Sequence, residues 1–276
     1  MNPISLPASY YQQFDADYSR DVPAEGYSGW KKSDVELAPK HTALVVVMHA
    51  WDCGKVEEWP GWRRAVEYYP RSVDIVESVF PPLLEAVRAT SMPVFHVVGW
   101  QEYYKDYPGY QKTLDIAGSS PEFPQVKSDP VYERSGQFRT DNIFVGKHNW
   151  PDVDAGRKTI RFPGPAKPVG DEPIAKDAHQ LAALCQAHDV NHLVYIGFAI
   201  NWCLLMSPGG MVDMSRYGIM CSTIREAVTA VENAETAREE KEKLQALWRV
   251  SLQFGFVFGL DDFTKAMGSL SVEKSE

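Results

Sequence analysis

Short unbroken apolar runs alternate along this chain with longer stretches of helical spacing. Apolar, largely β-branched residues fill three runs that are typical of strands buried on both faces, at 42–48, 93–98 and 192–196. Apolar residues recur every three or four positions in two stretches that predict helices, at 72–90 and 178–188. This alternation predicts an α/β fold of three layers, with a mostly parallel central sheet of about six strands and helices on both faces.

The pattern predicts further helices and strands in the last third of the chain. They are a helix at 211–217, a strand at 219–223, a long charged helix at 228–252, a strand at 254–258 and a short helix at 261–267. Residues 1–40 show no periodicity and predict an irregular arm before a single domain at 41–270. A segment rich in Pro, Gly, Tyr and Asp, at about 100–170, predicts an insertion with strand candidates only at 142–146 and 159–162. Long segments of this kind often form lids or binding loops.

Composition narrows the function classes. The formal net charge is -9 and no basic cluster occurs, which argues against nucleic acid and anionic membranes as partners. The four cysteines have no CxxC spacing and no disulfide-like density, which indicates a reducing compartment. The longest apolar stretch, 43–51, is too short for a membrane span, and the first residues lack a signal-peptide pattern. We expect a cytoplasmic protein.

Cys203 is the first candidate for chemistry. The apolar run at 192–196 leads into Gly197, and the thiol follows six residues later. A parallel strand that turns sharply into a helix has this pattern, and a helix N-terminus favours a thiolate and offers N–H groups to an oxyanion. An isolated cysteine is more often a small buried hydrophobe. Here the context of strand, glycine and turn favours a nucleophile.

Several segments, in this order, resemble the isochorismatase-like cysteine hydrolases, a group that includes nicotinamidases and carbamoyl-amide hydrolases. They are ALVVVMHAWD, PVFHVV, VGDEPIAK, HLVYIGFAINWC and YGIMCSTIREAVTA. The resemblance covers roughly residues 42–98 and 170–265 and implies a Rossmann-like sheet. It also implies hydrolysis of a small amide, ureido or related C–N bond, without a cofactor.

The resemblance implies three catalytic residues: a cysteine that attacks the carbonyl, an aspartate that carries the proton and a lysine that polarises the pair. Cys203 matches the cysteine, and Lys176, expected near its sulfur, matches the lysine, with Lys147 as a rival. The oxyanion donors would be the backbone N–H groups of Ala199 and Cys203, beside a cis peptide at Ala199–Ile200.

The aspartate is missing at the matching position. Met48 stands where the acid belongs, and methionine cannot accept a proton. Asp52 matches a second acid of the family, which is not the proton carrier. His49 has a suitable pKa, but neighbouring side chains of a strand point to opposite faces, so a bulge would be needed to bring it in. The alternative for His49 is a satisfied polar group at a strand end.

The turn around the cysteine departs from the pattern as well. Ile200 replaces a polar residue before Asn201, and Trp202 crowds the thiol. The sequence 207–210, Ser-Pro-Gly-Gly, predicts a helix that is short or restarts, because proline is costly inside a helix.

Other candidates are weaker. No zinc-type spacing joins the rim residues His49, Asp52, Cys53 and His96, so we expect no metal. The aromatic residues of the insertion would wall a pocket or cover the sheet: Trp100, Tyr103, Tyr104, Tyr107 and Tyr110. Their density, with that of the arm, predicts a homodimer or higher homo-oligomer.

Two functions remain open. The first is a cysteine-dependent hydrolase that acts on a small-molecule substrate through Cys203 and Lys176. The alternative is a catalytically impaired member of the same family that binds a small ligand or serves in an assembly, because Met48 replaces the aspartate.

Overall fold

The computed structural model describes residues 3–54, 57–99 and 101–272. The strands are β1 (Ile4–Gln12), β2 (Gly29–Leu37), β3 (Thr42–Met48), β4 (Val94–Val97), β5 (Ile174–Ala175), β6 (His192–Phe198), β7 (Met220–Thr229) and β8 (Val257–Phe258). The α-helices are α1 (Pro60–Ala65), α2 (Tyr69–Ser78), α3 (Phe80–Arg88), α4 (Pro108–Ala117), α5 (Pro130–Asn142), α6 (Trp150–Arg157), α7 (Ala178–Ala187), α8 (Met211–Arg216), α9 (Lys241–Gln253) and α10 (Leu260–Val272).

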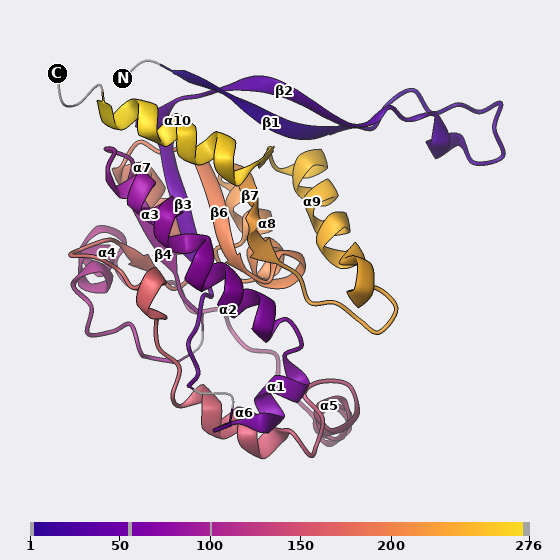
Figure 1. Cartoon of the computed structure of the whole chain (residues 1–276). Coiled ribbons are helices and arrows are strands. Elements are labelled where there is room, and N and C mark those ends of the chain that lie inside the picture. The colour runs from indigo at the N-terminus through magenta and orange to yellow at the C-terminus, as the bar shows by residue number, and fades with distance from the viewer. Residues whose placement is uncertain (1–2, 55–56, 100, 273–276) are drawn as a thin grey trace.

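One central sheet joins all these strands in the order β2-β1-β8-β7-β6-β3-β4-β5 (Figure 1). The strands from β8 to β5 pair in parallel, and β1 pairs antiparallel with both β2 and β8. The predicted α/β fold with a mostly parallel sheet is therefore confirmed, and the N-terminal hairpin adds two antiparallel strands to the parallel ones.

Helices cover both faces of the sheet, and the side chains of β6 show why. Leu193 and Tyr195 belong to the core that packs against α7, α8 and α9. Val194 and Ile196 belong to the core on the opposite face, against α3 and α10. Because alternate residues of a strand point to opposite faces, a strand in the middle of such a sheet must be apolar throughout. All seven residues of β6 are buried.

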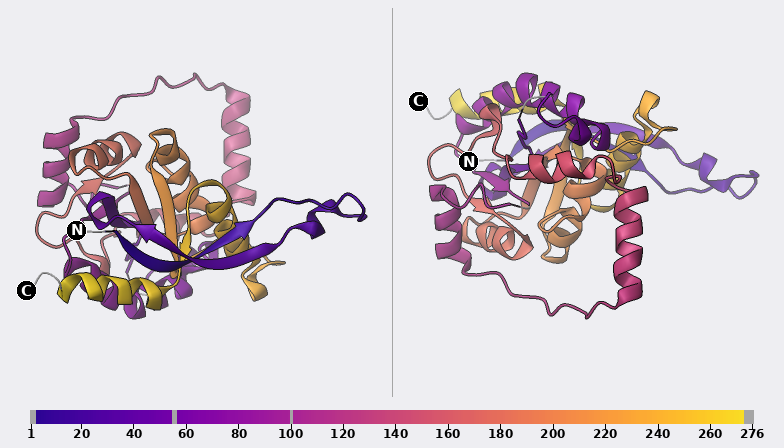
Figure 2. Two further views of the ribbon diagram at one scale, coloured as in Figure 1. Left: turned by 90° about the horizontal axis from the view of Figure 1, so that it is seen from above. Right: turned by 90° about the horizontal axis from the view of Figure 1, so that it is seen from below.

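The N-terminal segment differs from the prediction. Residues 1–40 were expected to be irregular, but β1 and β2 form a hairpin whose inner residues, Leu6, Ala8 and Leu37, are buried in the core. The outer part of the hairpin extends away from the body of the molecule (Figures 1 and 2). The prediction was wrong because the burial alternates with period two and involves few residues.

Other elements follow the sequence pattern with some corrections. The helical stretch predicted at 72–90 is divided in two, since α2 ends at Ser78 and α3 begins at Phe80 with Pro81 and Pro82 in its first turn, where prolines are tolerated. The long helix predicted at 228–252 is wrong in its first half, because β7 continues to Thr229 and α9 begins only at Lys241. The strand candidates at 142–146 and 159–162 are also wrong: α5 ends at Asn142, and the second contributes only an isolated bridge between Asp52 and Arg161.

The segment 100–170 contains α4, α5 and α6. Helix α6 packs against α1, where Trp62 and Val153 share a small core. Helix α5 has no buried residue, and an extended segment connects it to α4 along the outside of the molecule (Figure 2). A search of the described helices finds none with the length and apolar character needed to cross a membrane.

Candidate active site

The turn that carries Cys203 begins at Gly197, the last but one residue of β6. Its φ is +126°, and a Cβ atom there would lie 2.0 Å from the Met48 carbonyl oxygen, so no other residue fits. The cis peptide joins Phe198 and Ala199, one residue earlier than the expected Ala199–Ile200 bond. A π-helical turn then spans Ile200–Leu204 and places Cys203 above the end of the strand.

The helix that follows is short, as predicted. Helical geometry ends at residue 206, the loop 207–210 intervenes, and α8 starts again at Met211. Asn201 fixes the turn from the side, because its side-chain amide donates to the Val231 carbonyl at 2.8 Å and its side-chain carbonyl accepts from the Val231 N–H at 2.9 Å. A helix this short contributes little dipole at the thiol.

The Cys203 thiol is half-buried, whereas the other three cysteines are buried. Burial raises the pKa of the Cys203 thiol; hydrogen bonds from the Ser207 hydroxyl and the Ala199 backbone lower it, but the net direction is upward. The expected depression of this pKa by a helix N-terminus and a lysine is therefore wrong. The Ala199 N–H, expected as an oxyanion donor, lies at the sulfur in this structure.

Met48, for which the resemblance implies an acid, has apolar surroundings. It is fully buried and belongs to the same core as Ile200 and Leu204 of the turn. The nearest acid in sequence, Asp52, is engaged elsewhere: its carboxylate forms an ion pair with Arg161 at 2.8 Å and accepts the Gly54 N–H at 2.8 Å. A carboxylate placed to take the Cys203 proton from the Met48 side is thus lacking among the described residues.

His49 follows β3 in a left-handed conformation, with φ at +49°. Its ring stacks on Trp51 with centroids 5.5 Å apart, and burial lowers its pKa to about 4. The imidazole is therefore neutral at neutral pH. Its Nδ1 is buried and has no hydrogen-bond partner, so the satisfied polar group considered for His49 is not what the structure shows.

The two candidate lysines lie in different surroundings. Lys176 ends the segment after β5, is half-buried, and its backbone N–H donates to the Gln180 side chain at 2.9 Å. No ion pair of its ammonium occurs with the described part of the chain. Lys147 is exposed and lines none of the hollows described below. The geometry therefore favours Lys176 over Lys147 as the lysine of the site.

An apolar hollow of about 140 Å³ lies directly beside the thiol. Its aromatic walls are Trp51, Trp62, Tyr68, Phe144 and Trp202. The rings of Phe144 and Trp202 meet edge to face at 5.5 Å, and both side chains are partly exposed at the outer side. A cavity of roughly 150 Å³ is large enough for a benzene ring.

A carboxylate reaches this apolar hollow from α1's C-terminal side. Glu67 is among its lining residues, next to Tyr68, whose hydroxyl pKa is raised by burial and by the neighbouring Cys203 and Glu67. The Glu67 carboxylate accepts from Arg71 at 3.1 Å and from the Glu232 N–H at 2.7 Å. Its carboxylate is thus held by two donors.

A polar hollow of about 360 Å³ lies behind the same turn, and its lining includes His49, Lys176 and Ser207. Two contacts join it to the apolar hollow: the stack of His49 on Trp51, and the hydrogen bond between Ser207 and Cys203. The two hollows are therefore neighbours: Cys203 lines the apolar one, and its hydrogen-bond partner Ser207 lines the polar one.

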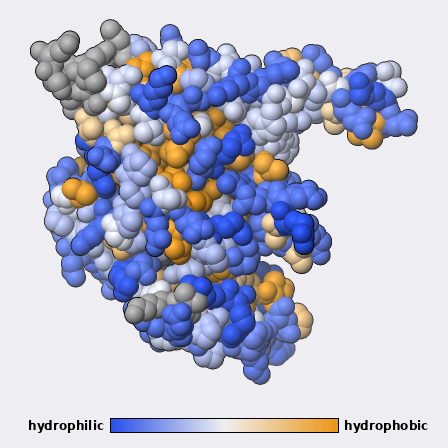
Figure 3. Space-filling view, viewed as in Figure 1, coloured by the Kyte–Doolittle hydropathy of each residue, from blue (hydrophilic) through white to orange (hydrophobic). Residues whose placement is uncertain are grey.

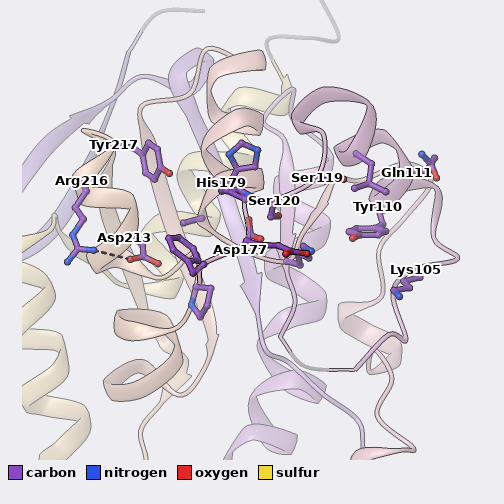
Figure 4. Close-up of a pocket in the computed structure, with 17 residues that line it drawn as sticks. Lys105, Tyr110, Gln111, Ser119, Ser120, Asp177, His179, Asp213, Arg216 and Tyr217 are labelled. Atoms are coloured by element: carbon purple, nitrogen blue, oxygen red, sulfur yellow. Dashed lines mark ion pairs between the residues drawn. The ribbon is translucent and has the colours of Figure 1, made fainter. Parts of the chain in front are cut away.

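A third, wider groove of about 1340 Å³ opens next to the polar hollow, and Lys176 and Pro208 line both. Figure 4 shows the groove between the ion pair of Asp213 with Arg216 on one side and the side chains around Tyr110 on the other. The groove gives the polar hollow a route to solvent.

Some aromatic residues of the insertion line a hollow or the groove, and others cover the sheet. Tyr104 and Tyr110 pack edge to face at 4.8 Å and border the polar hollow and the groove, respectively. Tyr103 and Tyr107 pack on Phe162 and cover the sheet. Trp100 lies outside the described residues.

Sequence reasoning missed Glu67, Tyr68, Trp62 and Phe144, which come to the thiol from segments before α2 and after α5. No spacing in the sequence links them to Cys203. The rim residues His49, Asp52, Cys53 and His96 form no metal cluster: the described chain holds no group of three or more His, Cys, Asp or Glu side chains placed to bind an ion.

No protein-family model matches the chain, and no curated protein does. The structure matches isochorismatase-like hydrolases, the group that the sequence resembles, at low sequence identity. A cysteine hydrolase from Pseudomonas syringae pv. phaseolicola 1448A is 13% identical with a TM-score of 0.47, and the match covers 85% of this chain and 95% of that one.

Two further structures give similar values. An isochorismatase-like hydrolase from Alkaliphilus metalliredigens is 13% identical with a TM-score of 0.48, covering 82% of this chain and 98% of its own. The nicotinamidase from Staphylococcus aureus is 12% identical with a TM-score of 0.38, covering 79% and 97%. At these identities the likeness concerns the fold.

Proposed function

We propose that this chain is a small-molecule-binding protein with a cysteine-hydrolase type of site, in which the hydrolytic step is impaired. Met48 carries this proposal. It is fully buried in an apolar core with Ile200 and Leu204, at the position where the resemblance places the proton carrier. Loss of a general base typically costs about 10²–10⁴-fold in rate.

The state of the thiol supports the same conclusion. The pKa of Cys203 is raised by burial, and the groups that oppose this, Ser207 and Ala199, are uncharged. A thiol rather than a thiolate prevails at neutral pH, and the thiol is the weaker nucleophile. Lys176 alone does not supply a base.

Ligand binding is supported by the hollows on the two sides of Cys203. One is apolar and aromatic with room for a ring, and the other offers polar groups. Concave sites with apolar walls and a few convergent polar groups are typical of small-molecule binding. The ligand would be a small molecule with a planar or aromatic part and a polar group, such as an amide or a ureido compound.

Glu67 favours a second candidate, which is slow hydrolysis of a small amide or ureido compound by Cys203 and Lys176. The Glu67 carboxylate lines the same hollow as the thiol. Tyr68 directly follows Glu67 in the chain, and its hydroxyl interacts electrostatically with both Glu67 and Cys203. In that case Glu67 would replace the aspartate as the base.

Turnover of benzamide, acetamide and phenylurea by wild type, Cys203→Ala and Met48→Asp tests the proposal. We expect wild type to lie within about tenfold of Cys203→Ala, and Met48→Asp to raise turnover up to about 100-fold, because it restores a base. Met206→Asp is the matched control. Met206 is exposed just after the turn that carries Cys203, so a carboxylate there should leave turnover unchanged.

Binding is measured separately, as the rise in unfolding temperature of wild type with benzamide, which follows mass action. A wild-type rate more than about 100-fold above that of Cys203→Ala would contradict the impaired site. Loss of that rate in Glu67→Gln would then establish the second candidate.

A further inference from the structure

The polar hollow contains hydrogen-bonding groups that the chain itself does not use. The His49 side chain is 4% exposed, and its Nδ1 has no hydrogen-bond partner. Leaving a buried polar atom unpaired costs about 1–3 kcal/mol, so such atoms usually have a role. The Nδ1 atom itself is covered, but the Nε2 atom of the same ring lies toward Gly99, and both residues line a hollow of about 360 Å³, large enough for a ligand.

The second unused group is a positive charge. Lys176 lines the same hollow, and its ammonium has no carboxylate partner among the described residues. The residue that would have supplied one across the strand ends is Met48, which is uncharged and buried in the core. A half-buried cation without a counter-charge favours an anion beside it.

Two of the carboxylates nearby form ion pairs. Glu102 lines the hollow but pairs with Lys105 and is largely exposed. In the groove that leads in, Asp213 pairs with Arg216 at 3.5 Å, and Asp177 accepts the Gln180 N–H at the start of α7 (Figure 4). The charges of Asp177 and Glu122 lie in the groove, and in the polar hollow itself Lys176 is the charged residue without an ion pair among the described residues.

We propose that the polar hollow is a carboxylate-binding site, in which Lys176 supplies the counter-charge and His49 a hydrogen bond, and which presents a small carboxylic acid to Cys203. This inference rests on the proposed ligand-binding function and names its ligand class. The hydrogen bond between Ser207 and Cys203 puts the thiol next to a residue that lines the hollow. An apolar or planar part of the same ligand would enter the 140 Å³ hollow on the other side.

A pair of alkylating reagents that differ only in charge tests the site. In both, the Cys203 thiolate attacks the CH₂ carbon, a C–S bond forms, and iodide leaves with the electron pair of the broken C–I bond, while the thiol proton goes to solvent. Iodoacetate carries the carboxylate, and iodoacetamide is its neutral counterpart. Because both react with the same thiolate, the ratio of their rates does not depend on the thiol pKa.

Rates at Cys203 are read by peptide mapping at pH 7 in the folded protein and in the protein unfolded in urea. We expect the iodoacetate-to-iodoacetamide ratio to be about tenfold higher in the folded protein, and the iodoacetate rate to saturate with concentration. Lys176→Met should reduce the ratio to the unfolded value. Lys147→Met, at an exposed lysine outside the hollow, should leave it unchanged.

Equal ratios in the folded and unfolded protein, or an unchanged ratio in Lys176→Met, would overturn the carboxylate site. A Cys203 that neither reagent alkylates would do the same, because it would separate the hollow from the thiol. The proposed function fails on different observations: rapid wild-type turnover of amides, or no stabilisation by neutral benzamide. Each idea can therefore fail while the other stands.

Discussion

Two buried histidines make the stability of this protein depend on pH in a defined direction. His49 and His192 are 4% and 8% exposed, and burial lowers the pKa of each to about 4 from the ordinary value of 6.5. Below pH 6.5 the unfolded chain binds protons at these residues while the folded chain does not. Stability is therefore fully present above pH 6.5 and is lost as the pH falls toward 4.

The size of the loss follows from the two pKa values. A fall from 6.5 to about 4 corresponds to about 3 kcal/mol for each histidine, at about 1.4 kcal/mol per pKa unit. At pH 5, where the change is incomplete, each contributes about 2 kcal/mol, so the two together remove about 4 kcal/mol. His96, whose pKa is also lowered by burial, acts in the same direction. Folded domains have only about 5–15 kcal/mol to lose.

Urea unfolding at pH 7.5 and pH 5.0 measures this loss. We expect the free energy of unfolding to fall by at least about 4 kcal/mol in wild type, and by about 2 kcal/mol less in His192→Gln, whose residue cannot be charged. His148→Gln is the matched control, because His148 is exposed and should not affect the difference. Free energies that agree within about 1 kcal/mol at the two pH values would refute the reasoning.

Two further predictions concern the turn and the surface. Gly197→Ala should lower the free energy of unfolding by about 3 kcal/mol or more, because φ is +126° and the new Cβ would lie 2.0 Å from the Met48 carbonyl oxygen. Gly170→Ala, at φ +59° with open space around it, should cost only about 1 kcal/mol, and equal losses in urea unfolding would show that crowding is not the cause. Light scattering should give a homodimer or higher oligomer at micromolar concentration, because Val131, Tyr132 and Phe138 of α5 are exposed apolar side chains. Apolar residues also reach the surface in patches on the body and near the hairpin tip (Figure 3), and a monomer mass would contradict this prediction.

The central part of the fold was predictable because its signals are local. Strands β3 and β6 are continuous apolar runs, and the prolines after α2 mark its end. The hairpin and the second half of β7 were not, since their partners lie far along the chain. In β7 the stretch around Val228 looks helical by composition, and only its pairing with β6 makes it a strand.

The site shows the same division. Cys203, Met48 and Lys176 could be proposed from the sequence because each lies at or just after the C-terminal end of a parallel strand, at the same edge of the sheet. The direction of the shift in the thiol pKa could not be predicted from the sequence, since it depends on how deeply the turn is buried. Glu67 and Phe144 reach the thiol only through tertiary packing of α1, α2 and the segment after α5.

Under the proposed function, Met48, at a position where the resemblance implies an acid, accounts for several features together. A carboxylate in that position would take the proton of the thiol and also neutralise Lys176. Without it, the thiol stays protonated by burial, and the lysine is left with an unused charge beside an unpaired imidazole. Under the two proposals, loss of the base and gain of an anion-binding hollow would both follow from the methionine at position 48. Met48→Asp should therefore act in both assays at once: it should raise amide turnover and weaken the preference of Cys203 for iodoacetate, because the new carboxylate competes for Lys176. A variant that gained turnover with its iodoacetate preference intact would show that Lys176 does not connect the two.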